Sequence, residues 1–447
     1  MTQTMRSPRH RPVLALALAG VLVAALLATA LVALAASCSS GDDDGAARLV
    51  WYTNPDNGGQ KTLAAKCTDQ SGGAYRITTQ VLPNDADAQR EQLVRRLAAN
   101  DSSIDLMSLD PVFVAEFANA GYLQPVTDPS DVASLTDGVL DAALSAAFWD
   151  DQLVATPFWA NTQLLWYRKS VAAAAGVDPA SPSFTWDRMI DTAVDQGKRV
   201  AVQARRYEGY MVWINALVAS GGGQIVENAE LGKDATPSMA SPAGDAAAEV
   251  VGKLANSPAA PADMSTATEE EARSLFQSDA GAFMVNWPYV YQAAKSAVES
   301  GALDQSVVDD IAWARYPRID EGTASKPPLG GIDLAIGKFT AHPDEALDAV
   351  KCITSLESNV QYMVESGNPA ARAGAYDDPA VREAFPMADL IRDSINDAGP
   401  RPFTPYYGDV STSVQRTWHP ATSVRAPQTP EKTDTYMGEV LSGDRLL

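Results

Sequence analysis

An early part of the chain alternates between short apolar runs and helical segments, and this alternation restricts the fold more than any other feature. Strands are expected at Leu49–Thr53, near 75–82 and at 104–109, with turn-forming residues after the first. Helices are expected between them, to about Cys67 and over 85–100, where apolar residues recur on one helical face. Strands that alternate with helices in this way predict a parallel sheet with helices on both faces.

The loops after two of these strands are the first place to expect a binding site, because ligands gather at the carboxyl ends of strands in such sheets. These loops cover 54–59 and 110–112. Further along, 161–168 is expected as one long extended strand and 282–286 as another. The chain after residue 38 holds roughly 400 residues, which is too long for one core and suits two lobes.

Composition limits the possible partners. The formal net charge is -22, which argues against nucleic acid and anionic lipid headgroups but not against a neutral ligand. The sequence has three histidines, one of them within the first 38 residues, and no cysteine cluster with metal-binding spacing. We therefore expect neither a metal site nor a cofactor.

The N-terminal segment has the pattern of a lipoprotein signal. Three arginines precede an apolar run from Val13 to Ala36, and Cys38 follows just before the chain turns polar. This pattern predicts a signal peptide over 1–37, a lipid on Cys38 and a flexible spacer over 38–47, with the rest of the chain anchored at the extracytoplasmic face of the cell membrane. A transmembrane anchor is the alternative, because the run is long enough to span a bilayer.

The remaining cysteines form an even pair. With Cys38 assigned to lipid, Cys67 and Cys352 are left. An even number of cysteines in an exported protein suggests one disulfide, with two buried free thiols as the alternative.

Catalytic signatures are absent from the sequence. It contains no G-x-S-x-G elbow, no P-loop, no H-E-x-x-H and no G-x-G-x-x-G. Glycosidase chemistry needs only two carboxylates, which a chain this acidic can supply, so an exported glycosidase stays open as an alternative. We expect a binding protein and not an enzyme.

Residues suited to a neutral sugar lie at strand ends and in turns. Carboxylate, amide and guanidinium groups bind paired hydroxyls, and an aromatic ring covers the apolar face of a sugar. The candidates in such places are Asp56, Asn57, Asp110, Asn161, Trp287, Arg401 and Tyr406.

Most of these candidates also have a purely structural explanation. The pair after the first strand can be turn formers, and Asp110 before a proline can cap a helix. Trp287 can belong to the core, and Arg401 can form a structural salt bridge. Glu269, at the start of an acidic helix, suits the helix dipole without any ligand.

Several blocks resemble the extracytoplasmic sugar-binding proteins of ABC importers, the maltose-binding-like family. They are the small residues before Cys38, Trp51–Thr53, Pro157–Arg168, Gly281–Pro288 and Gly330–Ile336. Within this family the chain is most similar to the trehalose-binding lipoproteins of actinobacteria, and the similar blocks span nearly the whole chain after the leader.

The resemblance implies an α/β fold of the periplasmic-binding-protein type, with two lobes joined by crossing strands and a ligand cleft between them. It implies an N-terminal lobe of 48–158 with 312–338, and a C-terminal lobe of 159–311 with 339–447. It also implies a disulfide between Cys67 and Cys352, because the family carries cysteines there.

The resemblance further implies ligand contacts from both lobes. The residues it assigns to the ligand are Asp110, Asn161, Glu269, Trp287 and Arg401, with Asp56 and Asn57 in the first turn. Glu208, Gly331 and Tyr406 lie in or near the similar blocks and complete the candidate set.

Three places depart from the family pattern. Asn57 stands where the family has an acid, the stretch 205–207 is more basic and aromatic, and the connection from 313–317 to Gly330 is shorter. These departures concern the identity of the ligand and not its class.

The function implied is the solute-binding component of an ABC sugar importer. It would capture a neutral disaccharide, with trehalose as the first candidate, and deliver it to a permease powered by an ATPase. Another α-glucoside and a glycerophosphodiester are the alternative ligands.

Overall fold

Two β-sheets organise the part of the chain that the computed structural model describes, residues 45–447. The expected signal peptide, the lipid on Cys38 and most of the spacer lie outside these residues. Within 45–447, no helix is both long and apolar enough to cross a membrane.

The first sheet contains the strands predicted near the N-terminus. Its strands are β1 (Ala47–Thr53), β2 (Tyr75–Val81), β3 (Leu106–Leu109), β6 (Thr156–Thr162) and β13 (Leu329–Ile336). Their order is β2-β1-β3-β13-β6. β1 pairs in parallel with β2 and β3, which confirms the predicted parallel arrangement. β13 is antiparallel to both β3 and β6, so β6 runs in the same direction as β3.

Helices from two distant parts of the chain cover this sheet. They are α2 (Gly59–Gln70), α3 (Ala86–Leu97), α4 (Pro111–Asn119), α5 (Pro129–Thr136), α6 (Asp141–Leu144), α14 (Pro343–Ile353), α15 (Leu356–Ser366), α16 (Pro379–Ala384) and α17 (Ala388–Asn396). α14 buries Ala346, Ala349, Val350 and Ile353, one stripe at helical spacing. It packs against β1, β13 and α2, and Cys352 of α14 forms a disulfide with Cys67 of α2. The predicted disulfide is therefore present, and the free-thiol alternative is wrong.

The second sheet lies in the middle of the sequence. Its strands are β7 (Leu164–Arg168), β8 (Arg199–Ala201), β11 (Gly281–Asn286) and β12 (Ile311–Ala314), in the order β12-β7-β11-β8. β8 is parallel to β11, and β7 is antiparallel to β11 and β12. Two small hairpin-like pairs complete the strands: β4 (Phe148–Trp149) with β5 (Gln152–Leu153), and β9 (Val226–Glu227) with β10 (Thr236–Pro237).

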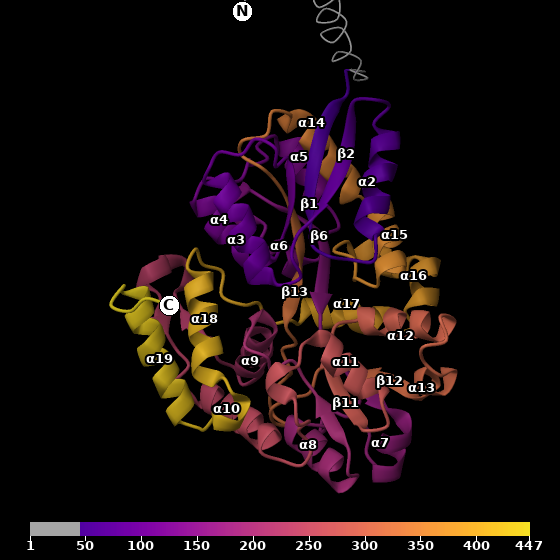
Figure 1. Ribbon diagram of the computed structural model, residues 1–447, viewed down its shortest axis with the longest axis vertical. Coiled ribbons are helices and arrows are strands. Elements are labelled where there is room, and N and C mark those ends of the chain that lie inside the picture. Colours follow the sequence, from indigo (N-terminus) through magenta and orange to yellow (C-terminus); the bar gives the residue numbers. More distant parts are fainter. Residues whose placement is uncertain (1–44) are drawn as a thin grey trace, which may run out of the picture. The chain divides into compact units, whose positions relative to one another are not determined.

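The remaining helices belong to this middle region and to the C-terminus. They are α7 (Lys169–Ala175), α8 (Trp186–Asp195), α9 (Glu208–Ser220), α10 (Pro242–Ala255), α11 (Glu269–Gln277), α12 (Tyr289–Glu299), α13 (Gln305–Asp310), α18 (Tyr407–Trp418) and α19 (Gln428–Leu441). Short 3₁₀ turns lie at Ala229–Asp234, Met264–Thr266, Ala373–Asp377 and Ala421–Ser423. α9 is buried on nearly all sides, as expected of a helix that is apolar all round. It packs against α10 and α18 (Figure 1).

We call each sheet with the helices packed on it a lobe. The predicted division placed 312–338 in the first lobe, but β12 pairs with β7 of the second sheet. It placed 339–447 in the second lobe, but α14 packs on β1 and β13, and α17 packs on β6. We therefore propose a division that follows the sheets, with 329–396 in the first lobe.

The chain crosses between the lobes at Gln163. The sequence predicted one strand over 161–168, but β6 ends at Thr162 in the first sheet and β7 begins at Leu164 in the second. The Gln163 amide donates to Oε1 of Gln203 at 3.0 Å, and the Gln203 amide donates to the carbonyl of Val285 at 2.9 Å. The expected strand is broken because its two halves find partners in different sheets.

Candidate ligand-binding site

The carboxyl ends of three first-lobe strands lie at the same edge of their sheet. β1, β3 and β6 all run in one direction, and their ends lead to Asp56, Asp110 and Asn161. In the second lobe, β11 ends at Asn286, which pairs with Leu164 next to the crossing point. Trp287 follows directly. The topology thus places predicted residues from both lobes near the point where the chain crosses between the sheets. They lie at the carboxyl ends of strands, where ligands bind in sheets of this kind.

Arg401 lies at the centre of a buried network that joins the lobes. Its side chain is 2% exposed. Nη2 donates to Oδ1 of Asp110 at 2.7 Å, and Nη1 donates to Oε1 of Glu208 at 2.6 Å. Tyr407 also donates to Glu208 Oε1, and Ser411 donates to Oε2 at 2.6 Å. The structural salt bridge considered for Arg401 is therefore present, and it has two carboxylate partners.

This network is surrounded by more acid than Arg401 can neutralise. Burial raises the pKa of Glu208 to about 7, against the opposing charge of Arg401. Burial and the neighbouring Asp85 raise the pKa of Asp87 to about 6. Burial and the charge of Asp110 hold the pKa of Asp333 well above its ordinary value, and its Oδ2 has no hydrogen-bond partner within 45–447. The protonated carboxyl of Asp333 can donate a hydrogen bond, so the region suits a ligand rich in hydroxyls.

Trp287, Asn161 and Gly330 come together where the lobes join. Gly330 pairs with Asn161 between β13 and β6. A Cβ added at Gly330 would lie 3.0 Å from Cη2 of Trp287 and 3.8 Å from Cβ of Asn161. Glycine therefore leaves room for the indole, which a larger residue would push back by a few tenths of an ångström. Asn161 is buried, and its Oδ1 accepts from the backbone N–H of Thr162 at 3.0 Å.

Gly331 has a backbone reason to be glycine. Its φ is +136°, and an added Cβ would lie 2.4 Å from the carbonyl oxygen of Trp159 on the paired strand. Only glycine fits this conformation and spacing. A ligand contact at Gly331 stays a prediction.

Glu269 is held beside Trp287. The amide of Asn286 donates to the backbone carbonyl of Glu269 at 3.0 Å. Burial raises the pKa of the Glu269 carboxyl, and the polar groups of Tyr207 and Trp287 oppose this effect. Its neighbour Glu271 instead forms a capping box with Thr268. Glu269 alone of these three acids at the start of α11 is largely withdrawn from solvent.

The side chains of Asp56 and Asn57, in the turn after β1, make structural contacts. Asp56 contacts the first turn of α2: its Oδ2 accepts from the N–H of Gln60 at 2.8 Å and from the hydroxyl of Tyr362 at 3.2 Å. Asn57 donates to the carbonyl of Glu365 at 2.9 Å. Both side chains are exposed, so the turn-forming explanation accounts for their present contacts, and their ligand contacts stay predictions.

Tyr406 is not part of the Arg401 network. Its ring lies 3.1 Å from where a Cβ of Gly232 would be, and the residue is 37% exposed. The next residue, Tyr407, reaches Glu208 instead. Sequence reasoning missed Tyr407, although the adjacent tyrosines after Pro405 gave the signal. It also missed Asp87 and Asp333, which carry no distinguishing local pattern.

Two cavities are lined in part by Arg401 or by its acidic neighbour Asp87. One of about 250 Å³ includes Arg401 and Asn215 in its lining. Another of about 280 Å³ is lined by Asp85, Asp87, Arg206, Tyr207, Thr412, Gln415 and Arg416.

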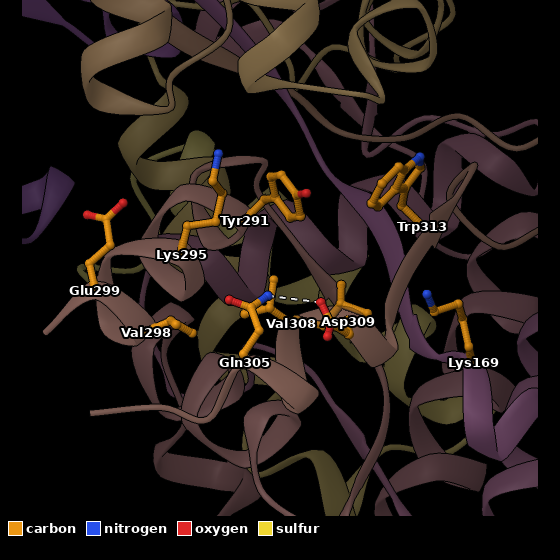
Figure 2. A pocket seen from close by; sticks show the side chains of 10 residues that line it. Lys169, Tyr291, Lys295, Val298, Glu299, Gln305, Val308, Asp309 and Trp313 are labelled. Carbon is orange, nitrogen blue, oxygen red and sulfur yellow. Dashed lines mark hydrogen bonds between the residues drawn. The ribbon is translucent and has the colours of Figure 1, made fainter. Parts of the chain in front are cut away.

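A larger cavity of about 570 Å³ lies elsewhere, between α12, α13 and the edge strand β12. Figure 2 shows Tyr291 and Trp313 on its wall, with Gln305 hydrogen-bonded to Asp309. No predicted binding residue lines it, so we do not place the site there despite its size.

Comparison with known proteins shows the family of the chain. The family model of the bacterial extracellular solute-binding protein matches residues 62–387. A probable ABC transporter-binding protein of Deinococcus radiodurans is 26% identical over 339 residues, which cover 72% of this chain and 75% of that protein.

Solved structures share the fold. Maltose-bound MalE3 of T. maritima superposes with a TM-score of 0.77 at 24% identity, over 90% of this chain and 100% of that one. The GacH receptor of Streptomyces glaucescens gives 0.73 at 20% identity, over 90% and 100%. A solute-binding protein of Agrobacterium radiobacter in complex with ribitol gives 0.71 at 19% identity, over 88% and 98%. These likenesses confirm the predicted two-lobed fold of the maltose-binding type.

More than half of the chain matches the family model. The chain belongs to the family of bacterial extracellular solute-binding proteins.

Proposed function

We propose that this protein is the solute-binding component of an ABC importer and that it captures a neutral disaccharide, with trehalose as the first candidate. The observation that carries the proposal is the pairing of Arg401 with both Asp110 and Glu208. An anionic ligand such as a glycerophosphodiester needs a free cation, and this guanidinium is already neutralised. A hydroxyl-rich neutral ligand can accept from and donate to the same network.

The arrangement supports capture by closure of two lobes. Asp110 and Asn161 come from the first lobe, whereas Glu208, Glu269, Trp287 and Arg401 come from the second lobe. A sugar that contacts both groups favours the state in which the lobes are together, by population shift. A permease would recognise that state, and an ATPase would power import.

Relatives support the sugar class. The fold is shared with proteins whose structures contain maltose, acarbose or ribitol. The similarity to trehalose-binding lipoproteins selects trehalose from this class, and Trp287 supplies the aromatic surface on which a glucose ring stacks.

A thermal-shift panel tests the ligand. We expect trehalose to raise the Tm of the purified protein more than maltose, other α-glucosides or a glycerophosphodiester. At a ligand concentration of 100 Kd the stabilisation is about 2.7 kcal/mol. A response to the glycerophosphodiester alone would reject the neutral-sugar assignment.

A turnover assay separates binding from catalysis. Protein incubated with trehalose should release no glucose, while calorimetry on the same sample detects binding. Glucose release above a protein-free control would make the protein a glycosidase.

The proposed membrane anchor has its own test. A fatty-acid probe should label the full-length protein in cells, and the label should be lost in Cys38→Ala. Equal labelling of both proteins would remove the lipid anchor from the proposal.

A further inference from the structure

The hydroxyl of Tyr207 is buried and has no hydrogen-bond partner within the described residues. Tyr207 lies directly before α9, in the stretch 205–207 that departs from the family pattern. A Cβ added at Gly209 would lie 2.2 Å from the Tyr207 oxygen, so the ring folds over the start of α9 and needs glycine there. Native proteins seldom leave a buried polar group unpaired unless water or a ligand completes it.

The hydroxyl interacts electrostatically with the Glu269 carboxyl, but no hydrogen bond with full geometry joins the two groups within the described residues. Burial raises the pKa of Tyr207 well above its ordinary value, and the charge of Glu269 adds to the effect. Tyr207 therefore keeps its proton and can donate. Glu269 in turn lies beside Trp287, so the unpaired hydroxyl adjoins the predicted sugar-binding residues.

The cavity lined by Tyr207 spans the two lobes. Asp85 and Asp87 reach it from the first lobe, and Arg206, Thr412 and Arg416 reach it from the second. The lining is polar and carries both signs of charge. Such a surface matches a neutral molecule with many hydroxyls better than an ion of either sign.

Arg205 holds the ring of Tyr207 from the other side. Its Cζ lies 4.5 Å from the ring centroid, a cation–π contact. Nη2 of the same side chain lies 3.3 Å from Oδ2 of Asp85 in the first lobe. Asp85 also caps α3 through the N–H groups of Asp87 and Ala88, so it is a fixed anchor. Arg205 therefore links the ring of Tyr207 to a residue of the first lobe.

We propose that Tyr207 is an additional ligand-binding residue, whose hydroxyl donates to a sugar hydroxyl beside Glu269 and whose ring is positioned by the Arg205–Asp85 pair when the lobes meet. The inference rests on the proposed sugar-binding function and adds a residue to its site.

Tyr207→Phe in the full-length protein tests it, with Tyr316→Phe as the matched control. The hydroxyl of Tyr316 is also buried without a hydrogen-bond partner among residues 45–447, but its ring packs on Trp186 in the second-lobe core. Both variants should have an unchanged or higher ligand-free Tm, because each loses an unsatisfied buried hydroxyl. Only Tyr207→Phe should bind trehalose more weakly, by about three- to tenfold in Kd.

Arg205→Ala gives a second measurement that leaves the hydroxyl in place. It should weaken trehalose binding in the Tyr207 protein and have a smaller effect in the Tyr207→Phe background, because the two residues act through one contact. Strictly additive effects would reject the positioning role of Arg205.

The outcomes separate this inference from the proposed function. If the wild type binds trehalose and Tyr207→Phe binds it equally well, the inference is overturned and the proposed function stands. If the wild type binds neither trehalose nor maltose, both are overturned.

Discussion

Opening the disulfide between Cys67 and Cys352 should destabilise the protein strongly. The bridge joins α2 to α14, and its cysteines are 285 residues apart in sequence. A cross-link acts mainly on the unfolded chain, because it removes conformations that an open chain can adopt.

The expected size follows from the length of the closed loop. For a separation of 285 residues, the loop-entropy relation gives about 5.6 kcal/mol at 25 °C. This is a large share of the roughly 5–15 kcal/mol that stabilises a typical domain. The m-value should also rise, because the reduced unfolded chain exposes more surface.

Equilibrium urea unfolding with and without a thiol reductant measures the effect. Reduced wild type keeps both sulfur atoms, so it separates loss of the bridge from any change in packing. The double variant Cys67→Ala with Cys352→Ala should unfold at the same urea concentration as the reduced protein, and the reductant should not affect it. A difference below about 1 kcal/mol between oxidised and reduced protein would refute the loop-entropy reasoning.

Three further predictions concern the binding site. Trp287→Ala should abolish the thermal shift caused by trehalose while the protein stays folded by circular dichroism; an unchanged shift would contradict its stacking role. Arg401→Ala should destabilise the protein by about 3–5 kcal/mol at pH 7.5 in urea unfolding, because Asp110 and Glu208 lose their buried partner; a change within 1 kcal/mol would mean that solvent reaches them. Folding raises the pKa of Glu208 from 4.5 to about 7, so the folded protein holds this proton more tightly than the unfolded chain does. The bound proton therefore adds about 3 kcal/mol to the free energy of unfolding. This contribution is complete below pH 4.5 and is lost as the pH rises through 7. Glu208→Gln should remove that pH dependence, and identical slopes for both proteins would exclude Glu208 as its source.

Local patterns were sufficient to predict the first sheet's parallel core. β1 and β3 are short apolar runs, β2 is rich in residues that favour strands, and helices separate them. These signals are contained in a few neighbouring residues. The insertion of β13 between β3 and β6 left no such signal, because it depends on pairing between segments more than 160 residues apart. The break at Gln163 was missed for the same reason: apolar and aromatic residues continue on both sides of it.

Prediction of the binding site is limited in the same way, because contacts between residues far apart in sequence leave no local signal. Arg401 was a strong candidate because prolines on both sides fix its backbone. Its partner Glu208 lies 193 residues away, and only the fold reveals that Glu208, Tyr407 and Arg401 meet. Asp56 shows the converse, since a residue type suited to sugar binding instead accepts a hydrogen bond from Gln60 in the first turn of α2.

The position of β13 also affects how the chain acquires its structure. The first sheet cannot close until residues 329–336 are available to fill the gap between β3 and β6. Contacts of such long range form slowly, because a large loop must be closed before they are made. A growing chain that has not yet reached this strand cannot complete its N-terminal lobe. For an extracellular protein this delay is useful, since a polypeptide that remains unfolded during synthesis can still be threaded across a membrane.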